Sequence, residues 1–278
     1  MRLRRGGAVD RSSPPEPTVS GTESTQTHQL SEEMLKWSPW ALLPLSFSLF
    51  TAGGLWVVYY IAVSDGTIAP LGSPYRGNGS LYAPYISIAG NNPPASCVFS
   101  EVMNLSAFLG FLIAILRYLQ LKHRIQVWLN VVTLVGFSFV CFGLTLVGNF
   151  QLFHQTIIHN IGTFMTFVLG TLFCWVQSFI TLRVNMNNEG KVVGVARFLL
   201  SAVITVCMVV YMTLMSQKLH VQAAQWQWAL VMSFLTFFGT FAIEFRHSSF
   251  EAVCIELCVQ PVSVSEPPTE IPMNKHEM

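Results

Sequence analysis

Charged side chains are scarce in this sequence. Only 10% of the 278 residues are Asp, Glu, Lys or Arg, whereas 52% are hydrophobic, and the mean hydropathy is +0.50. Soluble domains carry about 25% charged residues, so this chain has too few to cover a surface that faces water. The net charge is only +1, and no basic cluster is interleaved with aromatic residues, which argues against a nucleic-acid partner. The composition therefore indicates a protein whose main partner is the lipid bilayer.

The cysteine pattern lacks the pairing that a disulfide framework or a structural zinc site requires. Three of the six cysteines fall inside long apolar blocks, and Cys97 alone is placed on the outer side of the membrane. Cys254 and Cys258 closely follow the last apolar block. We interpret them as candidate sites of S-palmitoylation, with two unmodified thiols as the alternative.

Catalytic and cofactor motifs are also missing. The sequence has no nucleophile-elbow motif, no phosphate-binding loop, no His-Glu-x-x-His motif and no pair of carboxylates within an apolar block. These absences favour a protein that is not an enzyme and that needs neither a cofactor nor a metal.

Six apolar blocks are long enough to cross a bilayer, which takes roughly 20 residues. They are continuously apolar and lack the alternation of a barrel strand, so the sequence predicts an all-α membrane protein with a six-helix transmembrane bundle. The blocks cover about 40–63, 98–119, 127–149, 158–182, 195–216 and 226–246.

Polar segments flank this transmembrane domain, which we place at 40–250. Residues 1–39 and 251–278 contain little apolar sequence and several prolines, so they cannot bury enough surface to offset the entropy of ordering. We expect both to be disordered cytosolic tails. Met34 is an alternative translation start.

The distribution of Lys and Arg predicts the orientation. With both termini in the cytosol, all but Arg76 and Lys218 of the 15 basic residues fall on the inside, as the positive-inside rule expects. This topology places the longest loop, 64–97, outside the cytosol. Asn78 in that loop begins an Asn-Gly-Ser glycosylation motif, and we predict that it is modified. Asn104 begins a second such motif but lies inside a predicted span.

Polar and small residues recur at helical spacing in two predicted spans. A hydrated path and close helix packing both explain such a pattern, and packing is the favoured interpretation. The two series are His159, Thr163, Thr166, Gly170, Cys174 and Gln177 in the fourth span, and Ala229, Ser233, Thr236, Thr240 and Glu244 in the sixth. Glu101 and Glu244 are the only carboxylates in the spans, both near span ends, where an ordinary interfacial role is an alternative to a functional one.

Conformationally restricted segments border the outer ends of the second and third spans. Tandem prolines precede Cys97 and Glu101, and Gly148 stands at the end of the third span. We expect residues 93–100, Glu101 and residues 148–151 to meet in an outer cap. The candidate cap or permeation residues are Cys97, Glu101, Asn104, Asn149 and Gln151.

The same segments carry a family resemblance. In order, the motifs are APYISIAG (83–90), PPASCVFS (93–100), GNFQ (148–151) and HN (159–160). Together they resemble the damage-regulated autophagy modulator family of six-span membrane proteins, over about residues 37–250. Further motifs, NNEG (187–190) and FGTFA (238–242) among them, are similar to its tentonin branch, in the transmembrane protein 150 subfamily.

The resemblance implies two functions. One is that of a subunit or modulator of a mechanically activated cation conductance at the plasma membrane, acting as a homo-oligomer or with partner channel subunits. The other is that of a non-conducting regulator or scaffold in autophagy at the lysosomal or endosomal membrane, or in recruitment of a phosphoinositide kinase. The family supplies no agreed pore or ligand residues to carry over.

Overall fold

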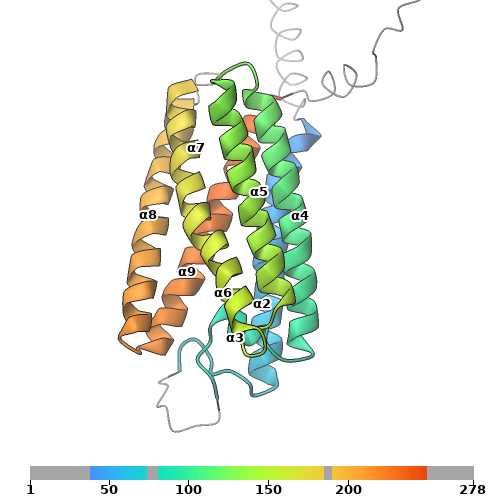
Figure 1. Ribbon diagram of the computed structural model, residues 1–278, viewed down its shortest axis with the longest axis vertical. Coiled ribbons are helices and arrows are strands. Elements are labelled where there is room, and N and C mark those ends of the chain that lie inside the picture. The colour runs from blue at the N-terminus through green and yellow to red at the C-terminus, as the bar shows by residue number, and fades with distance from the viewer. Residues whose placement is uncertain (1–37, 74–80, 185–189, 249–278) are drawn as a thin grey trace, which may run out of the picture. The chain divides into compact units, whose positions relative to one another are not determined.

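Long helices dominate the computed structural model, which describes residues 38–73, 81–184 and 190–248 (Figure 1). Six helical segments in these ranges are long and apolar enough to cross a membrane, which confirms the predicted all-α, six-span fold. They run over Pro39–Ser64, Ala95–Leu121, Val127–Asn149, Thr156–Val184, Gly190–Ser216 and His220–Phe245.

Three of the spans are divided into shorter elements. The first consists of η1 (Pro39–Ala41) and α2 (Leu42–Ser64), the second is α4 (Ala95–Leu121), and the third is α5 (Val127–Asn149). The fourth comprises α6 (Thr156–Phe164), the π-helical turn η2 (Met165–Leu169) and α7 (Gly170–Val184); the fifth is α8 (Gly190–Ser216). The sixth comprises α9 (His220–Gly239) and α10 (Phe241–Phe245), and the short helix α3 (Ile86–Ala89) lies in the first loop.

The sixth span begins earlier than its hydropathy predicts. The predicted start was residue 226, but α9 already begins at His220. Ala223 and Ala224 are fully buried, so the polar stretch before residue 226 is one amphipathic turn of the helix. Hydropathy alone misses such a turn because only one face of it is apolar.

The spans form a closed ring in which each packs against the next in the chain and α9 packs back against α2. One end of the ring holds the start of the first span and the end of the last, where the Ser38 backbone N–H donates to the Arg246 carbonyl at 3.1 Å. We call this the terminal end, at the top of Figure 1, and the opposite end, which holds α3, the loop end.

Aromatic rings fill the axis of the ring. Phe137 of α5 stacks on Phe173 of α7 with centroids 4.3 Å apart, and Phe238 of α9 lies 5.0 Å from Phe137. All three side chains are buried. The middle of the bundle is therefore a packed apolar core.

The loop-end half of the fourth span lies unusually close to α5. A Cβ atom built at Gly162 would lie 2.8 Å from the carbonyl oxygen of Gly143, and one built at Gly143 would lie 2.8 Å from the carbonyl oxygen of Gly162. Only residues without side chains allow the two backbones to approach so closely. The π-helical turn η2 follows directly and redirects the chain into α7, which packs against α8.

Candidate functional site

Two of the five predicted cap residues, Asn104 and Asn149, are brought together in an amide cluster at the loop end. The side chains of Asn104 and Asn149 donate to each other at 2.9 and 3.0 Å, and the Ser100 hydroxyl donates to Asn149 at 2.8 Å. At Gly148 a Cβ would lie 2.6 Å from the Cβ of Met103. The α4–α5 contact is thus close at this point and fastened by hydrogen bonds.

A buried histidine connects the same turn to the first loop. His159 of α6 is within 2.7 Å of the Phe150 carbonyl oxygen through Nδ1 and within 2.9 Å of the Ser87 hydroxyl through Nε2. The side-chain oxygen of Asn91 accepts from the Phe153 backbone N–H at 2.9 Å. These contacts hold the cap together through side chains of the first loop and of α6 and through backbone groups of Phe150 and Phe153.

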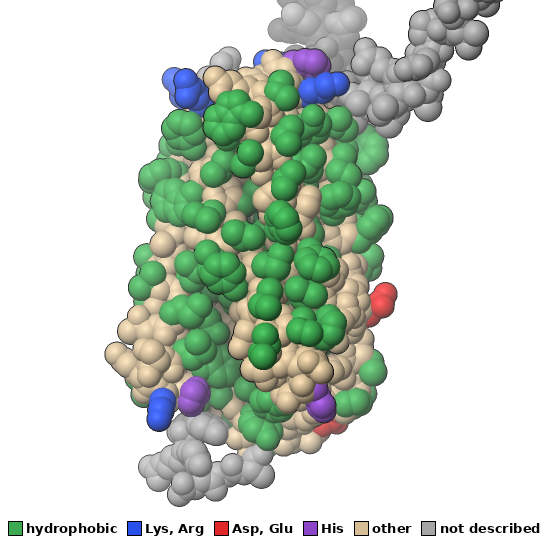
Figure 2. All heavy atoms as spheres, in the orientation of Figure 1, with side chains coloured by type: hydrophobic (Ala, Val, Ile, Leu, Met, Phe, Trp, Pro, Cys, Tyr) green, Lys and Arg blue, Asp and Glu red, His purple; other side chains and the backbone are tan. Residues whose placement is uncertain are grey.

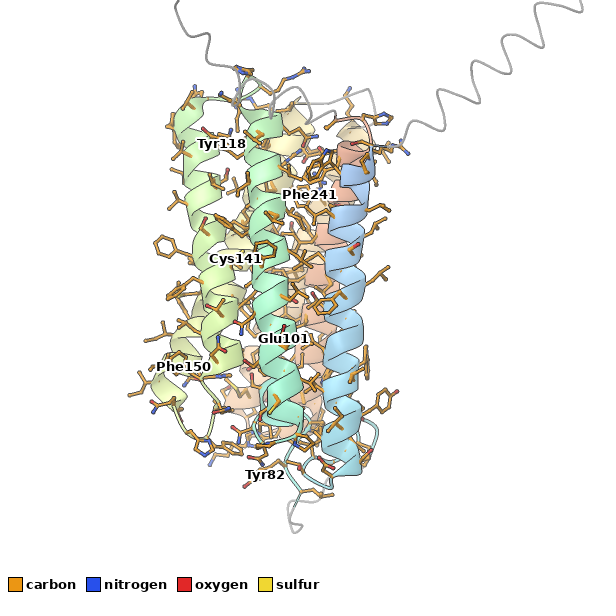
Figure 3. All side chains as sticks on the ribbon, turned by 90° about the vertical axis from the view of Figure 1, so that its right-hand side faces the viewer. Tyr82, Glu101, Tyr118, Cys141, Phe150 and Phe241 are labelled. Atoms are coloured by element: carbon orange, nitrogen blue, oxygen red, sulfur yellow. The ribbon has the colours of Figure 1, made fainter. Side chains whose placement is uncertain are left out.

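Glu101 does not point into this cluster. Its side chain is exposed in the loop-end half of α4 (Figure 3), whereas Asn104, one turn further on, makes the amide contacts. Cys97 is also exposed and carries a free thiol. Gln151 contributes its carbonyl oxygen, which accepts from the His154 and Gln155 backbone N–H groups. Asn78, Cys254 and Cys258 lie outside the described residues.

The first loop is also attached to the sixth span. The Gln227 side chain accepts from the Ile86 N–H at 2.9 Å, and Trp228 Nε1 donates to the Pro84 carbonyl at 3.0 Å. The Tyr85 hydroxyl lies 3.1 Å from Nδ1 of His220. Burial raises the pKa of Tyr85 to about 12, so its phenol keeps its proton at neutral pH.

Two hollows lie on the inner side of this cap. A cavity of about 100 Å³ sits between Phe47, Met103, Val140 and Phe234, and its lining is almost entirely apolar. A second hollow of about 380 Å³ lies at the loop end, where residues of α6, α8 and α9 line it, and its rim includes Phe164 and Met212, whose side chains are exposed. The space lies beside α6.

The polar series of the fourth and sixth spans meet only at the terminal end, where Gln177, Thr240 and Glu244 contact the same two arginines. In the fourth span His159, Gly170 and Cys174 are buried, as helix packing predicts. In the sixth span Ala229 and Thr236 are exposed on the outer surface of the bundle. The two series therefore do not line a common path through one chain.

The terminal end contains an ionic network buried in the bundle. Nη1 of Arg197 lies 2.6 Å and Nη1 of Arg117 lies 3.1 Å from Oε2 of Glu244, and the three side chains are at most 6% exposed. They come from α4, α8 and α10. The sequence placed Glu244 near a span end and counted Arg117 and Arg197 among the basic residues on the inner side. The structure corrects this, because all three side chains are buried and both arginines pair with Glu244.

Neutral groups also bind the two arginines. The Thr181 hydroxyl of α7 accepts from Arg197 at 2.6 Å and from Arg117 at 3.2 Å. Arg117 also donates to Gln177 at 3.0 Å, and Arg197 donates to Thr240 at 2.8 Å. Fixed hydrogen bonds and a shared carboxylate are what make buried guanidinium groups tolerable.

Phe241 packs against both arginines. Its ring centroid is 4.1 Å from Cζ of Arg197 and 5.3 Å from Cζ of Arg117, distances typical of cation–π contacts. Figure 3 shows Phe241 near the terminal end of the bundle. Two cations and one anion leave the network with a formal charge of +1, and it joins α4, α7, α8 and α10.

Within the described ranges, no group of three or more His, Cys, Asp or Glu side chains could hold a metal ion. A ring of six spans, a hydrogen-bonded cap at one end and a buried ionic network at the other define an integral membrane protein of the multi-pass α-helical class.

The chain belongs to the Frag1/DRAM/Sfk1/Cwh43P family, whose N-terminal domain model matches residues 39–248. This match confirms the family resemblance that the loop motifs indicated. The proteins similar to this chain include members of the transmembrane protein 150 group.

The relatives carry names that refer to autophagy or only to the membrane. Modulator of macroautophagy TMEM150B-B of Xenopus laevis is 33% identical over 75% of this chain and 87% of its own length. Modulator of macroautophagy TMEM150B of Homo sapiens is 32% identical over 86% of this chain and 97% of its own length. Transmembrane protein 150A of Xenopus laevis is 30% identical over 78% of this chain and 88% of its own length. No solved structure matches the chain.

Proposed function

We propose that this protein is a membrane-embedded regulator of macroautophagy that does not conduct ions through a pore of its own. The observation that carries the proposal is the packed axis, where Phe137, Phe173 and Phe238 stack on one another. The ionic network lies beyond them at the terminal end. The proposed process, macroautophagy, is taken from the names of the relatives. Such a regulator would act through its lipid-facing and terminal-end surfaces and reside in a lysosomal or endosomal membrane.

A second candidate is a subunit or modulator of a mechanically activated cation conductance at the plasma membrane. The feature that favours it is the hollow beside α6, which adjoins the central cavity through Thr163 and Phe167. Stretching the bilayer could change how such a space is filled. In this function the exposed Glu101 would line a path only between chains or between the chain and a partner subunit.

Stretch of reconstituted membranes separates the two candidates. We expect patches of liposomes that contain the purified full chain to show no more current than protein-free patches, because the axis is closed by aromatic side chains. In cells that lack the protein, its re-expression should change the turnover of an autophagosome marker at least twofold. A stretch-activated cation current that is reduced by Glu101→Gln at equal protein density would instead support the conductance and contradict the regulator proposal.

We further propose that both termini face the cytosol and that the loop end faces away from it. Of the basic residues in the described ranges, Lys122, Arg124, Arg183 and Lys191 are exposed at the terminal end, whereas Lys218 lies at the loop end. The terminal end thus still has more exposed basic residues than the loop end, even though Arg117 and Arg197 are buried and no longer count as loop charges.

Glycosylation provides the test of this orientation. Asn78→Gln should remove a glycosidase-sensitive mass shift, and Asn104→Gln should leave it unchanged, because Asn104 lies within α4 and bonds to Asn149. The shift is measured by electrophoresis of the full chain before and after glycosidase treatment. An epitope tag after Met278 that is labelled on intact cells would contradict the proposed orientation.

A further inference from the structure

A basic cleft opens between α5 and α7 at the terminal end. Its volume is about 1140 Å³, which is larger than that of either hollow beside the cap. Arg124 and His123 of the α4–α5 turn lie on one side, and Arg183 in the last turn of α7 lies on the other. Trp128 and Phe179 continue the walls along the spans. Figure 2 shows basic side chains gathered at this upper end, above a broad apolar band.

The cations of this cleft have no carboxylate partner in the described part of the chain. The carboxylates there are Asp65, Glu101 and Glu244. Asp65 follows the loop end of α2, and Glu101 lies in the loop-end half of α4. Glu244 is shared by the buried arginines. Within the described ranges, the cleft therefore presents positive charge at a membrane boundary with no carboxylate beside it.

The remaining walls suit the apolar part of an amphiphile. Trp128 is 63% and Phe179 58% exposed, and Val176 and Ile180 line the same cleft. The Arg183 guanidinium lies 6.0 Å from the Phe179 ring, so charge and apolar surface are adjacent. Indole side chains prefer the interface between lipid headgroups and acyl chains. A basic rim above an apolar wall matches the two parts of an acidic phospholipid.

We propose that this cleft binds an anionic phospholipid, with its phosphate between Arg124 and Arg183 and its acyl chains along Trp128 and Phe179. A guanidinium is suited to phosphate because its planar fork donates two parallel hydrogen bonds. The proposed orientation places the cleft in the cytosolic leaflet, where anionic lipids are concentrated. The site is separate from the cap and from the buried ionic network.

Native mass spectrometry of the full chain, titrated with phosphatidylserine in detergent, tests the proposal. The double variant Arg124→Gln/Arg183→Gln should bind phosphatidylserine about 30-fold more weakly, because each basic residue near an anionic lipid contributes roughly a fivefold factor. Both side chains are exposed, so the variant should keep its Tm. The loss should shrink at high salt, where the charges are screened.

A charge-matched control distinguishes the cleft from general attraction to a positive surface. Lys122 and Lys191 are exposed at the same end but do not line the cleft, and Lys122→Gln/Lys191→Gln should change affinity less than threefold. An equal loss in the two variants would overturn the proposal. The proposal would be overturned as well if phosphatidylcholine bound with the same affinity as phosphatidylserine. Competition by glycerophosphoserine as strong as that by the intact lipid would also overturn it, since the ligand would then be a soluble phosphate.

Discussion

Glu244→Gln is expected to lower the free energy of unfolding by about 3–5 kcal/mol, because it leaves two buried guanidinium groups without their counter-charge. Glutamine keeps the size of the side chain, so packing is little changed. The effect is measured as the loss of Tm of the detergent-solubilised protein and, where unfolding is reversible, by denaturant titration.

Two further variants make the result specific to charge. Glu101→Gln applies the same chemical change to an exposed side chain of α4 and should shift stability by less than about 0.5 kcal/mol. Glu244→Gln combined with Arg197→Met removes one cation as well as the anion, leaving the formal charge of the network at +1, and should recover part of the loss. If Glu244→Gln were as stable as Glu101→Gln, the ion pairs described here would not hold the terminal end together.

Gly162→Ala is expected to destabilise the bundle by about 1–3 kcal/mol through overpacking. The new Cβ would meet the Gly143 carbonyl oxygen and the Leu146 Cβ, each at 2.8 Å, and neither atom belongs to the flexible end of a side chain. α6 would have to move away from α5. The measurement is Tm by fluorescence-detected size exclusion of the full chain.

Gly136→Ala in α5 is the matched control for this substitution. A Cβ at Gly136 would have no neighbour within 4 Å, and alanine favours a helix interior over glycine by about 1 kcal/mol. We therefore expect Gly136→Ala to leave stability unchanged or slightly increased. Equal destabilisation by the two alanines would contradict the prediction, because helix propensity favours alanine at both positions and only Gly162 lies at the close α5–α6 contact.

Hydropathy was sufficient to predict the architecture of this protein. Spans of roughly 20 apolar residues have few alternatives in a bilayer, and six of them appear where predicted, with limits that differ mainly at amphipathic turns such as His220–Gln225. The cap could be anticipated because Pro93, Pro94 and Gly148 restrict the backbone near adjacent helix ends. Its bonding pattern could not, since the choice of Asn104 rather than Glu101 as the partner of Asn149 depends on the rotation of α4.

The ionic network shows a different limit. Arg117, Arg197 and Glu244 each fall inside a predicted apolar block at the same end of the bundle, so comparing their depths could have suggested a pairing. That pairing was missed because the two arginines were counted as loop charges. The contacts with Thr181 and Phe241 depend on the way four helices are rotated against one another, which hydropathy does not encode.

The ring order also has a consequence for the way the protein is made. Ribosomes deliver the spans in sequence, so Arg117 and Arg197 enter the bilayer before Glu244, the carboxylate that both contact. Until the sixth span arrives, each arginine has only neutral partners, and the face of α2 that receives α9 is covered by lipid or by a chaperone. Arrival of the last helix closes the ring and supplies the counter-charge in one step. A chain truncated before His220, where α9 begins, would therefore carry an open seam and two unmatched cations, features by which quality control could identify an unfinished product.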